Sequence, residues 1–212
     1  EKGQTDAGLR RQMEKEKVSS ELSYLKAQIN PHFFFNTLNN IYSLTTLDVE
    51  RAQKAILKLS RMMRYVLYET DKETTYLSRE LDFIKDYIDL MRLRLTDKVK
   101  LILNIQEPSE DITIAPMLLL PFIENCFKHG VSAKTESKIE IIISQKGKIL
   151  ELKTVNLKFP PNPKSKENMG SGIGLTNTKR RLDLIYGEKC RLLIDEKNPE
   201  NEYRIQLNID LG

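Results

Sequence analysis

The chain has 212 residues, of which 40% are hydrophobic, so it can bury the core of one large domain or two small ones. Charged residues make up 30% of it, but the net charge is only +4 and like charges do not cluster, which argues against nucleic-acid binding. No stretch approaches the roughly 20 consecutive apolar residues of a membrane helix, and no signal peptide opens the chain. Cys126 and Cys190 are isolated, without a CxxC pair, which indicates a reduced, cytoplasmic compartment.

Two amphipathic helices are predicted at the start of the chain. Apolar residues recur at helical spacing across residues 9–46, and again after Asp48, an N-capping residue type, as far as residue 67. The short connection between them predicts a helical hairpin. A single hairpin has little core of its own, so we expect a second copy to cover its apolar faces in a homodimeric four-helix bundle.

A polar run at residues 69–75 breaks this pattern, and we place the boundary of two domains there, 1–72 and 73–212. Beyond it we expect a helix capped by Ser78, a strand at 99–105, a buried helix at 118–129 and a hairpin of strands at 139–144 and 149–155. A loop rich in Pro, Lys, Asn and Gly follows, then a helix that ends at Gly187 and strands at 191–195 and 203–211. The predicted fold class is α+β, with a helical hairpin followed by an α/β sandwich.

The most informative segment surrounds His32, one of only two histidines in the chain. Gln28, His32 and Asn36 recur every four residues and so form a polar stripe along a helix that is otherwise apolar. Pro31 removes a backbone donor and is expected to bend this helix just before His32. A lone histidine at such a place is either a hydrogen-bonded core residue or a nucleophile, and its neighbours decide between these.

Gln28, Pro31, His32, Phe33 and Asn36 resemble the phosphoacceptor box of the LytS-like sensor histidine kinases, a Gln-x-x-Pro-His-Phe-x-x-Asn run. The resemblance implies that His32 receives the γ-phosphoryl group of ATP, as a neutral imidazole can. It also implies that Asn36 orients a water molecule when the protein acts as a phosphatase. Many histidine kinases carry an acidic residue directly after the acceptor, where this chain has Phe33, so the proton acceptor stays unassigned.

Residues 120–130 resemble the N-box of the Bergerat (GHKL) ATPase fold, which histidine kinases share with gyrase and heat-shock chaperones. The resemblance implies that Asn125 offers an oxygen ligand to Mg²⁺ and that Lys128 binds the phosphates of ATP. Glu124 matches the catalytic acidic residue beside this Asn in kinases. His129 either contacts the nucleotide or only interacts favourably with the dipole at the end of its helix. Gyrases and chaperones carry a catalytic Glu where Pro121 stands here, which disfavours simple ATP hydrolysis.

A glycine-rich motif precedes the last helix and resembles the glycine box and ATP lid of the same fold. Glycines let the backbone approach phosphates, and the helix that follows directs its amide groups toward them. The nucleotide-binding residues expected here are Gly170, Gly172, Gly174, Leu175 and Asn177.

Asn156 stands at the strand end where this family usually has an Asp that receives the adenine amino group. A neutral amide is a weaker acceptor than a carboxylate, so we expect weaker ATP binding. An amide can also flip, so we expect less selectivity between ATP and GTP.

Together the motifs predict a sensor histidine kinase with ATP and Mg²⁺ as cofactors, a homodimer, and a response regulator as partner. The resemblance implies the cytoplasmic portion of a membrane protein whose sensory region precedes Glu1. Two other functions stay open: a dimeric pseudokinase that binds nucleotide poorly because of Asn156, and a chaperone-like ATPase, which Pro121 disfavours.

Overall fold

The computed structural model describes residues 31–132, 135–160 and 173–212, and the chain divides into two units, Glu1–Lys72 and Glu73–Gly212. Much of the first predicted helix, with Gln28, lies outside the described residues. No helix in the described part of the chain has the length and apolar character needed to cross a membrane.

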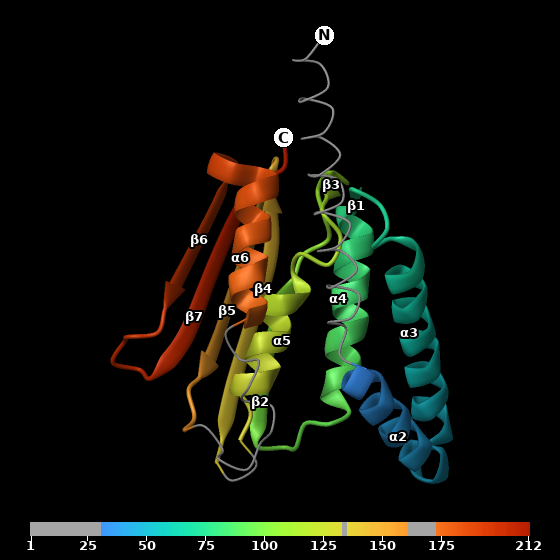
Figure 1. Ribbon diagram of the computed structural model, residues 1–212. Coiled ribbons are helices and arrows are strands. Elements are labelled where there is room, and N and C mark those ends of the chain that lie inside the picture. The colour runs from blue at the N-terminus through green and yellow to red at the C-terminus, as the bar shows by residue number, and fades with distance from the viewer. Residues whose placement is uncertain (1–30, 133–134, 161–172) are drawn as a thin grey trace. The chain divides into compact units, whose positions relative to one another are not determined.

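The first unit contains the predicted helical hairpin, which is confirmed for its described part. Helix α2 spans Pro31–Leu47 and helix α3 spans Val49–Tyr68 (Figure 1). Asp48 caps α3, because its Oδ1 accepts a hydrogen bond of 2.9 Å from the backbone N–H of Arg51. The hairpin buries a stripe from each helix, at helical spacing: Phe33, Thr37 and Ile41 from α2, and Ala52, Ala55, Leu59 and Met62 from α3.

Many large apolar side chains of the same two helices are exposed. Tyr42 and Leu47 on α2 are 78% and 81% exposed, and Leu57 and Leu67 on α3 are 62% and 61% exposed. A folded protein rarely leaves so many large apolar groups uncovered on one small unit. The homodimeric four-helix bundle, which would cover them, stays a prediction.

The second unit is built on a five-stranded sheet with the order β2-β4-β5-β7-β6. The strands are β2 (Val99–Ile105), β4 (Ser137–Lys146), β5 (Ile149–Leu157), β6 (Cys190–Asp195) and β7 (Glu202–Asp210). β2 runs parallel to β4, and the other neighbours are antiparallel. Gly147, with φ +58°, makes the predicted turn between β4 and β5. Two very short strands that pair with each other, β1 (Thr75–Tyr76) and β3 (Thr113–Ile114), were not predicted.

Helices α4 (Leu77–Arg92), α5 (Leu120–His129) and α6 (Ile173–Tyr186) belong to the same unit, and α5 and α6 pack on the sheet (Figure 1). The strands alternate between buried and more exposed residues, as expected when one face of a sheet is covered. The buried positions face one another across the ladder: Ile139, Ile141, Ile143, Leu150, Leu152, Thr154, Ile205, Leu207 and Ile209. The α+β fold class is therefore confirmed.

The start of α4 differs from the prediction that Ser78 caps it. The capping position is Tyr76, which forms no side-chain cap, and Ser78 lies inside the first turn. The orphan amide of Ser78 is bound instead by Asp111, whose Oδ1 accepts from Ser78 N at 2.9 Å and whose Oδ2 accepts from Ser78 Oγ at 2.8 Å. The cap comes from 33 residues away, so no local pattern could predict it.

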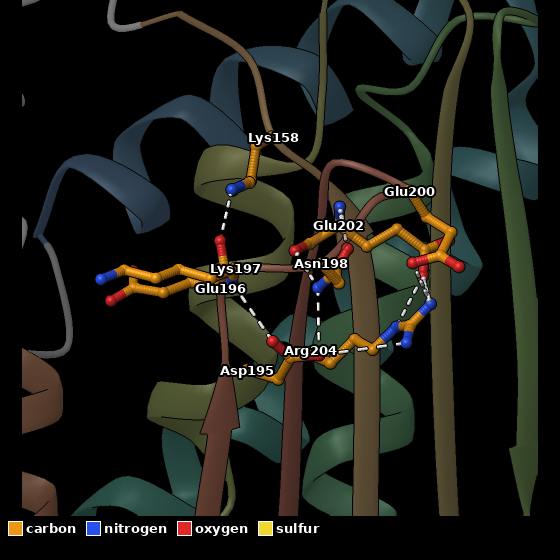
Figure 2. A network of polar contacts seen from close by, with 8 residues as sticks. All are labelled: Lys158, Asp195, Glu196, Lys197, Asn198, Glu200, Glu202 and Arg204. Carbon is orange, nitrogen blue, oxygen red and sulfur yellow. Dashed lines mark hydrogen bonds and ion pairs between the residues drawn. The ribbon is translucent and has the colours of Figure 1, made fainter.

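The turn between β6 and β7 braces the end of β5 (Figure 2). Asn198 holds the turn together by accepting from Glu202 N and donating to Glu202 O, both at 3.0 Å. Lys158, the residue after β5, donates its Nζ to Glu196 O at 2.5 Å and its backbone N–H to Asn201 O at 3.0 Å. These contacts fix the strand end that carries Asn156.

Candidate functional site

His32 lies in the first turn of α2 and is exposed, while the next residue, Phe33, is buried and 7% exposed. Phe33 stacks edge-to-face on Phe34, with ring centroids 5.5 Å apart. The two rings anchor this turn of the helix and leave the imidazole outside. The bend expected at Pro31 falls at the edge of the described residues.

Asn36, one turn further on, contacts the imidazole ring itself. Its Nδ2 lies 3.1 Å from Nε2 and 3.2 Å from Nδ1 of His32. The amide nitrogen is nearly equidistant from the two ring nitrogens, so it contacts the ring as a whole and does not select one nitrogen as its acceptor. The predicted role for Asn36 was to orient a water molecule, and the structure adds that it is placed to orient the imidazole.

Helix α5 carries the four N-box residues on its less buried side. Its other side is closed by apolar residues, since Phe122 and Ile123 are fully buried. Glu124, Asn125 and His129 are partly exposed and Lys128 is exposed. Asn125 lies three residues before Lys128 and four before His129, so these polar groups share one face of the helix.

Burial alters the proton affinities of two of these groups. It raises the pKa of Glu124, an effect that the neighbouring ammonium of Lys128 opposes. It lowers the pKa of His129, and Lys128 lowers that pKa further. Glu124 is therefore a stronger base than a free glutamate, and His129 is neutral at physiological pH and available to donate or accept a hydrogen bond.

Asn156 lies on the helix-covered face of β5, directly beneath the end of α5. A Cβ atom placed on Gly130 would approach the Cβ of Asn156 to 2.6 Å, so only glycine fits here. The residue after His129 thus touches the strand residue that was predicted to face adenine. The structure brings two distant parts of the sequence, the N-box and Asn156, to one place.

The Asn156 amide is buried, 1% exposed, and its two polar atoms differ in their surroundings. Nδ2 donates to the carbonyl of Leu157 at 2.9 Å, whereas Oδ1 has no hydrogen-bond partner in the described part of the chain. An unpaired buried acceptor costs about 1–3 kcal/mol, so this oxygen is a natural place for a ligand that donates a hydrogen bond. Oδ1 is closed to solvent, so such a ligand reaches it only if neighbouring side chains shift.

The bond to Leu157 changes the expectation that Asn156 loosens nucleotide selectivity. A flipped amide would place its oxygen against the Leu157 carbonyl and lose this hydrogen bond. The amide is therefore held with Nδ2 paired and Oδ1 as its unpaired acceptor. We therefore expect the side chain to offer a ligand its acceptor oxygen and not its donor NH₂ group.

Cys126, on the buried side of α5, is not a candidate nucleophile. Burial raises the pKa of its thiol to about 11, so the reactive thiolate is scarce at neutral pH. Cys190 likewise has a raised pKa, chiefly from burial.

Gly174, Leu175 and Asn177 lie in the first turns of α6, which packs beside α5 (Figure 1). Gly170 and Gly172 lie outside the described residues. A Cβ on Gly174 would meet no neighbouring atom within 4 Å, so packing among the described residues does not require glycine there.

Sequence reasoning missed a set of buried contacts around residues 115–119, the loop that leads into α5. Glu80 on α4 and Arg181 and Tyr186 on α6 bind its backbone. The only sequence signal was the acidic Glu80 beside the apolar positions of its helix.

Residues 20–99 match the family model described as histidine kinase. Over 194 residues the chain is 31% identical to the sensor protein LytS of Oceanobacillus iheyensis, an alignment that covers 86% of this chain and 33% of that protein. Over 176 residues it is 34% identical to the sensor histidine kinase YpdA of Escherichia coli K12, covering 80% of this chain and 31% of that protein.

Among solved structures, the histidine kinase domain of the blue-light activated kinase EL346 from Erythrobacter litoralis aligns with 92% of this chain and 93% of that one, at 11% identity and a TM-score of 0.48. The chain spans about a third of the length of the curated relatives it matches. On the family match and these relatives, the chain belongs to the LytS-like sensor histidine kinases.

Proposed function

We propose that the chain is the catalytic region of a two-component sensor histidine kinase, which transfers the γ-phosphoryl group of ATP to its own His32. The observation that carries this proposal is the exposed imidazole of His32, held by the amide of Asn36. In-line attack on phosphorus needs a ring nitrogen that a nucleotide held elsewhere on the protein can approach, and exposure supplies that.

In the transfer step, a lone pair on a His32 ring nitrogen attacks the γ-phosphorus. A nitrogen–phosphorus bond forms as the bond from phosphorus to the β,γ-bridging oxygen breaks, and ADP leaves with the electron pair. Asn36 assists by holding the ring in one orientation before the attack, which lowers the entropic cost of reaching the transition state. The phosphoryl group would then pass to an aspartate of a response regulator.

The second unit would hold ATP with Mg²⁺. Asn125 supplies a neutral oxygen ligand of the kind Mg²⁺ accepts, and Lys128 offsets the negative charge of the phosphates. The unpaired Oδ1 of Asn156 fits the exocyclic amino group of adenine, which is a hydrogen-bond donor. We expect His129 to contact the nucleotide beside them, and Gly170, Gly172, Gly174, Leu175 and Asn177 would approach the phosphates at the start of α6.

Glu124 is the group we assign as the proton acceptor. Attack by a neutral imidazole leaves a cationic phosphoimidazole, and its remaining N–H proton must pass to a base. No acidic residue directly follows His32, whereas Glu124 stands beside Asn125 in the N-box, where the resemblance to kinases places an acidic residue.

The proposed kinase function also implies the partners of the chain. The exposed apolar side chains of α2 and α3 support a homodimer in which two hairpins form a four-helix bundle. A response regulator is the phosphoryl acceptor, and a sensory region outside this chain would tie the protein to the membrane. Asn36 would also orient water for phosphatase activity, as the phosphoacceptor box implies.

One other function has a specific observation in its favour. A pseudokinase that signals by conformation alone is supported by Asn156, because a neutral amide binds adenine less strongly than a carboxylate does. The hydrogen bond from Asn156 to Leu157 weakens the case for a pseudokinase, because it holds the Asn156 amide as an oriented acceptor for adenine.

The glutamate assignment predicts that Glu124→Gln slows self-phosphorylation by roughly 10²–10⁴-fold, the range that general base catalysis contributes. Mg-ATP affinity should stay near wild type, since the amide keeps the size of the side chain. Single-turnover labelling and calorimetry measure the two quantities. Normal labelling rates in the variant would move the proton acceptor elsewhere.

For the acceptor itself, His32→Gln should abolish self-phosphorylation and leave Mg-ATP affinity unchanged, because His32 and the N-box belong to different units. The readout is transfer of label from γ-labelled ATP to the protein. Persistent acid-labile labelling of this variant would place the acceptor at His129.

The oriented amide of Asn156 predicts that the protein binds ATP about tenfold more tightly than GTP, because the guanine carbonyl would face the acceptor Oδ1 and leave both atoms unpaired. Asn156→Leu, which keeps the shape but removes both polar atoms, should bind the two nucleotides about equally. Titration of each nucleotide into each protein measures the preference.

Asn156→Asp serves as the control for orientation. It would set a carboxylate oxygen against the Leu157 carbonyl in a buried place, so it should lower the free energy of unfolding by about 1–3 kcal/mol. Such a carboxyl has a raised pKa when folded, so the loss should shrink as pH falls and the group is protonated. Equal affinity of the wild type for ATP and GTP would mean that Asn156 does not face the base.

A further inference from the structure

The loop of residues 115–119, which leads into α5, is held by side chains from two other helices. Ala115 N donates to the hydroxyl of Tyr186 at 2.9 Å, and Arg181 Nη2 donates to the carbonyl of Pro116 at 2.9 Å. Met117 N donates to Glu80 Oε2 at 2.9 Å and Leu119 N donates to Glu80 Oε1 at 3.2 Å. Four of the backbone groups before the N-box helix are thus bound by side chains.

The loop adopts a backbone shape that needs this support. Met117 has φ +57°, in the left-handed region that residues other than glycine seldom adopt. Ala115, Met117, Leu118 and Leu119 are buried, so solvent cannot satisfy their amides. A non-glycine residue in this conformation costs about 1–3 kcal/mol, and it persists where the surroundings fix it.

Two of the three side chains that fix the loop come from α6, whose first turn carries Gly174 of the glycine motif. Arg181 lies one helical turn after Asn177 and two turns after Gly174, and Tyr186 is the last residue of the same helix. α6 therefore carries expected nucleotide-binding residues at its start and holds the entrance to α5 with its later turns. Glu80 holds the same loop from α4, and its own side chain is fully buried.

We propose that Arg181, Tyr186 and Glu80 are positioning residues for the nucleotide site. They fix residues 115–119, and this loop in turn sets α5 so that Asn125 and Lys128 face the phosphates at the start of α6. This inference rests on the proposed ATP site. In this proposal the three residues act on the nucleotide only through the placement of α5. A small displacement of α5 would move both groups together, so nucleotide affinity should respond more than overall stability does.

The first arm of the test measures Mg-ATP affinity by calorimetry on the whole chain. Arg181→Met removes the guanidinium but keeps much of the side-chain length, and it should weaken Mg-ATP binding about tenfold, as loss of one charged hydrogen bond would. Tyr186→Phe should weaken binding in the same direction. Arg191→Met, at an exposed arginine on β6, is the matched control and should bind as the wild type does.

The second arm needs no nucleotide. Hydrogen exchange at the amides of residues 117–123 should be faster in Arg181→Met and in Tyr186→Phe than in the wild type or in Arg191→Met, while urea unfolding reports global stability. A purely structural role would lower stability in urea without changing affinity per folded molecule. Arg181→Lys, which keeps a donor, should recover part of the affinity.

The outcomes separate this inference from the proposed function. Weaker Mg-ATP binding together with faster exchange at residues 117–123 supports the positioning role. Unchanged affinity in both Arg181→Met and Tyr186→Phe, or unchanged exchange at these amides, overturns it. If the wild type itself bound no Mg-ATP, the proposed function would fail, and the exchange arm alone would decide whether these side chains position α5.

Discussion

The contact between Gly130 and Asn156 is the constraint on which the candidate nucleotide site depends. The end of α5 reaches the end of β5 only because Gly130 carries no side chain, and any Cβ there would lie 2.6 Å from the Cβ of Asn156. This close approach sets the N-box over the one strand residue whose buried carbonyl oxygen has no partner in the described chain. The brace between Lys158 and the β6–β7 turn fixes that strand end from the other side.

Much of the fold could be predicted from the sequence because its signals are local. The alternation of buried and exposed residues in β4 and β5 gave the hairpin around Gly147, and the spacing of Ala52, Ala55 and Leu59 gave the second helix. What could not be predicted depends on residues far apart in the chain. Asp111 caps α4 from 33 residues away, and Arg181 binds Pro116 across 65 residues. No window along the sequence contains both members of such a pair.

The candidate site divides in the same way. Motifs predicted His32, Asn125 and Lys128 as site residues, since each lies in a short run whose spacing is typical of that chemistry. They did not reveal that Asn36 contacts the ring of His32, or that the amide of Asn156 is held in one orientation by Leu157. Both are hydrogen bonds whose geometry depends on side-chain rotamers. The second leads us to predict a preference for ATP over GTP, where the sequence alone predicted loose selectivity.

The two units would have complementary tasks, since the hairpin offers a nucleophile and the sheet domain offers a nucleotide. The most direct test of this account is incubation of the chain with γ-labelled ATP, followed by acid and base treatment of the denatured protein and mapping of the labelled peptide. The account predicts label that is lost in acid, survives base and lies on the peptide containing His32. Steady release of phosphate without labelled protein, or bound ATP without any transfer, would contradict it.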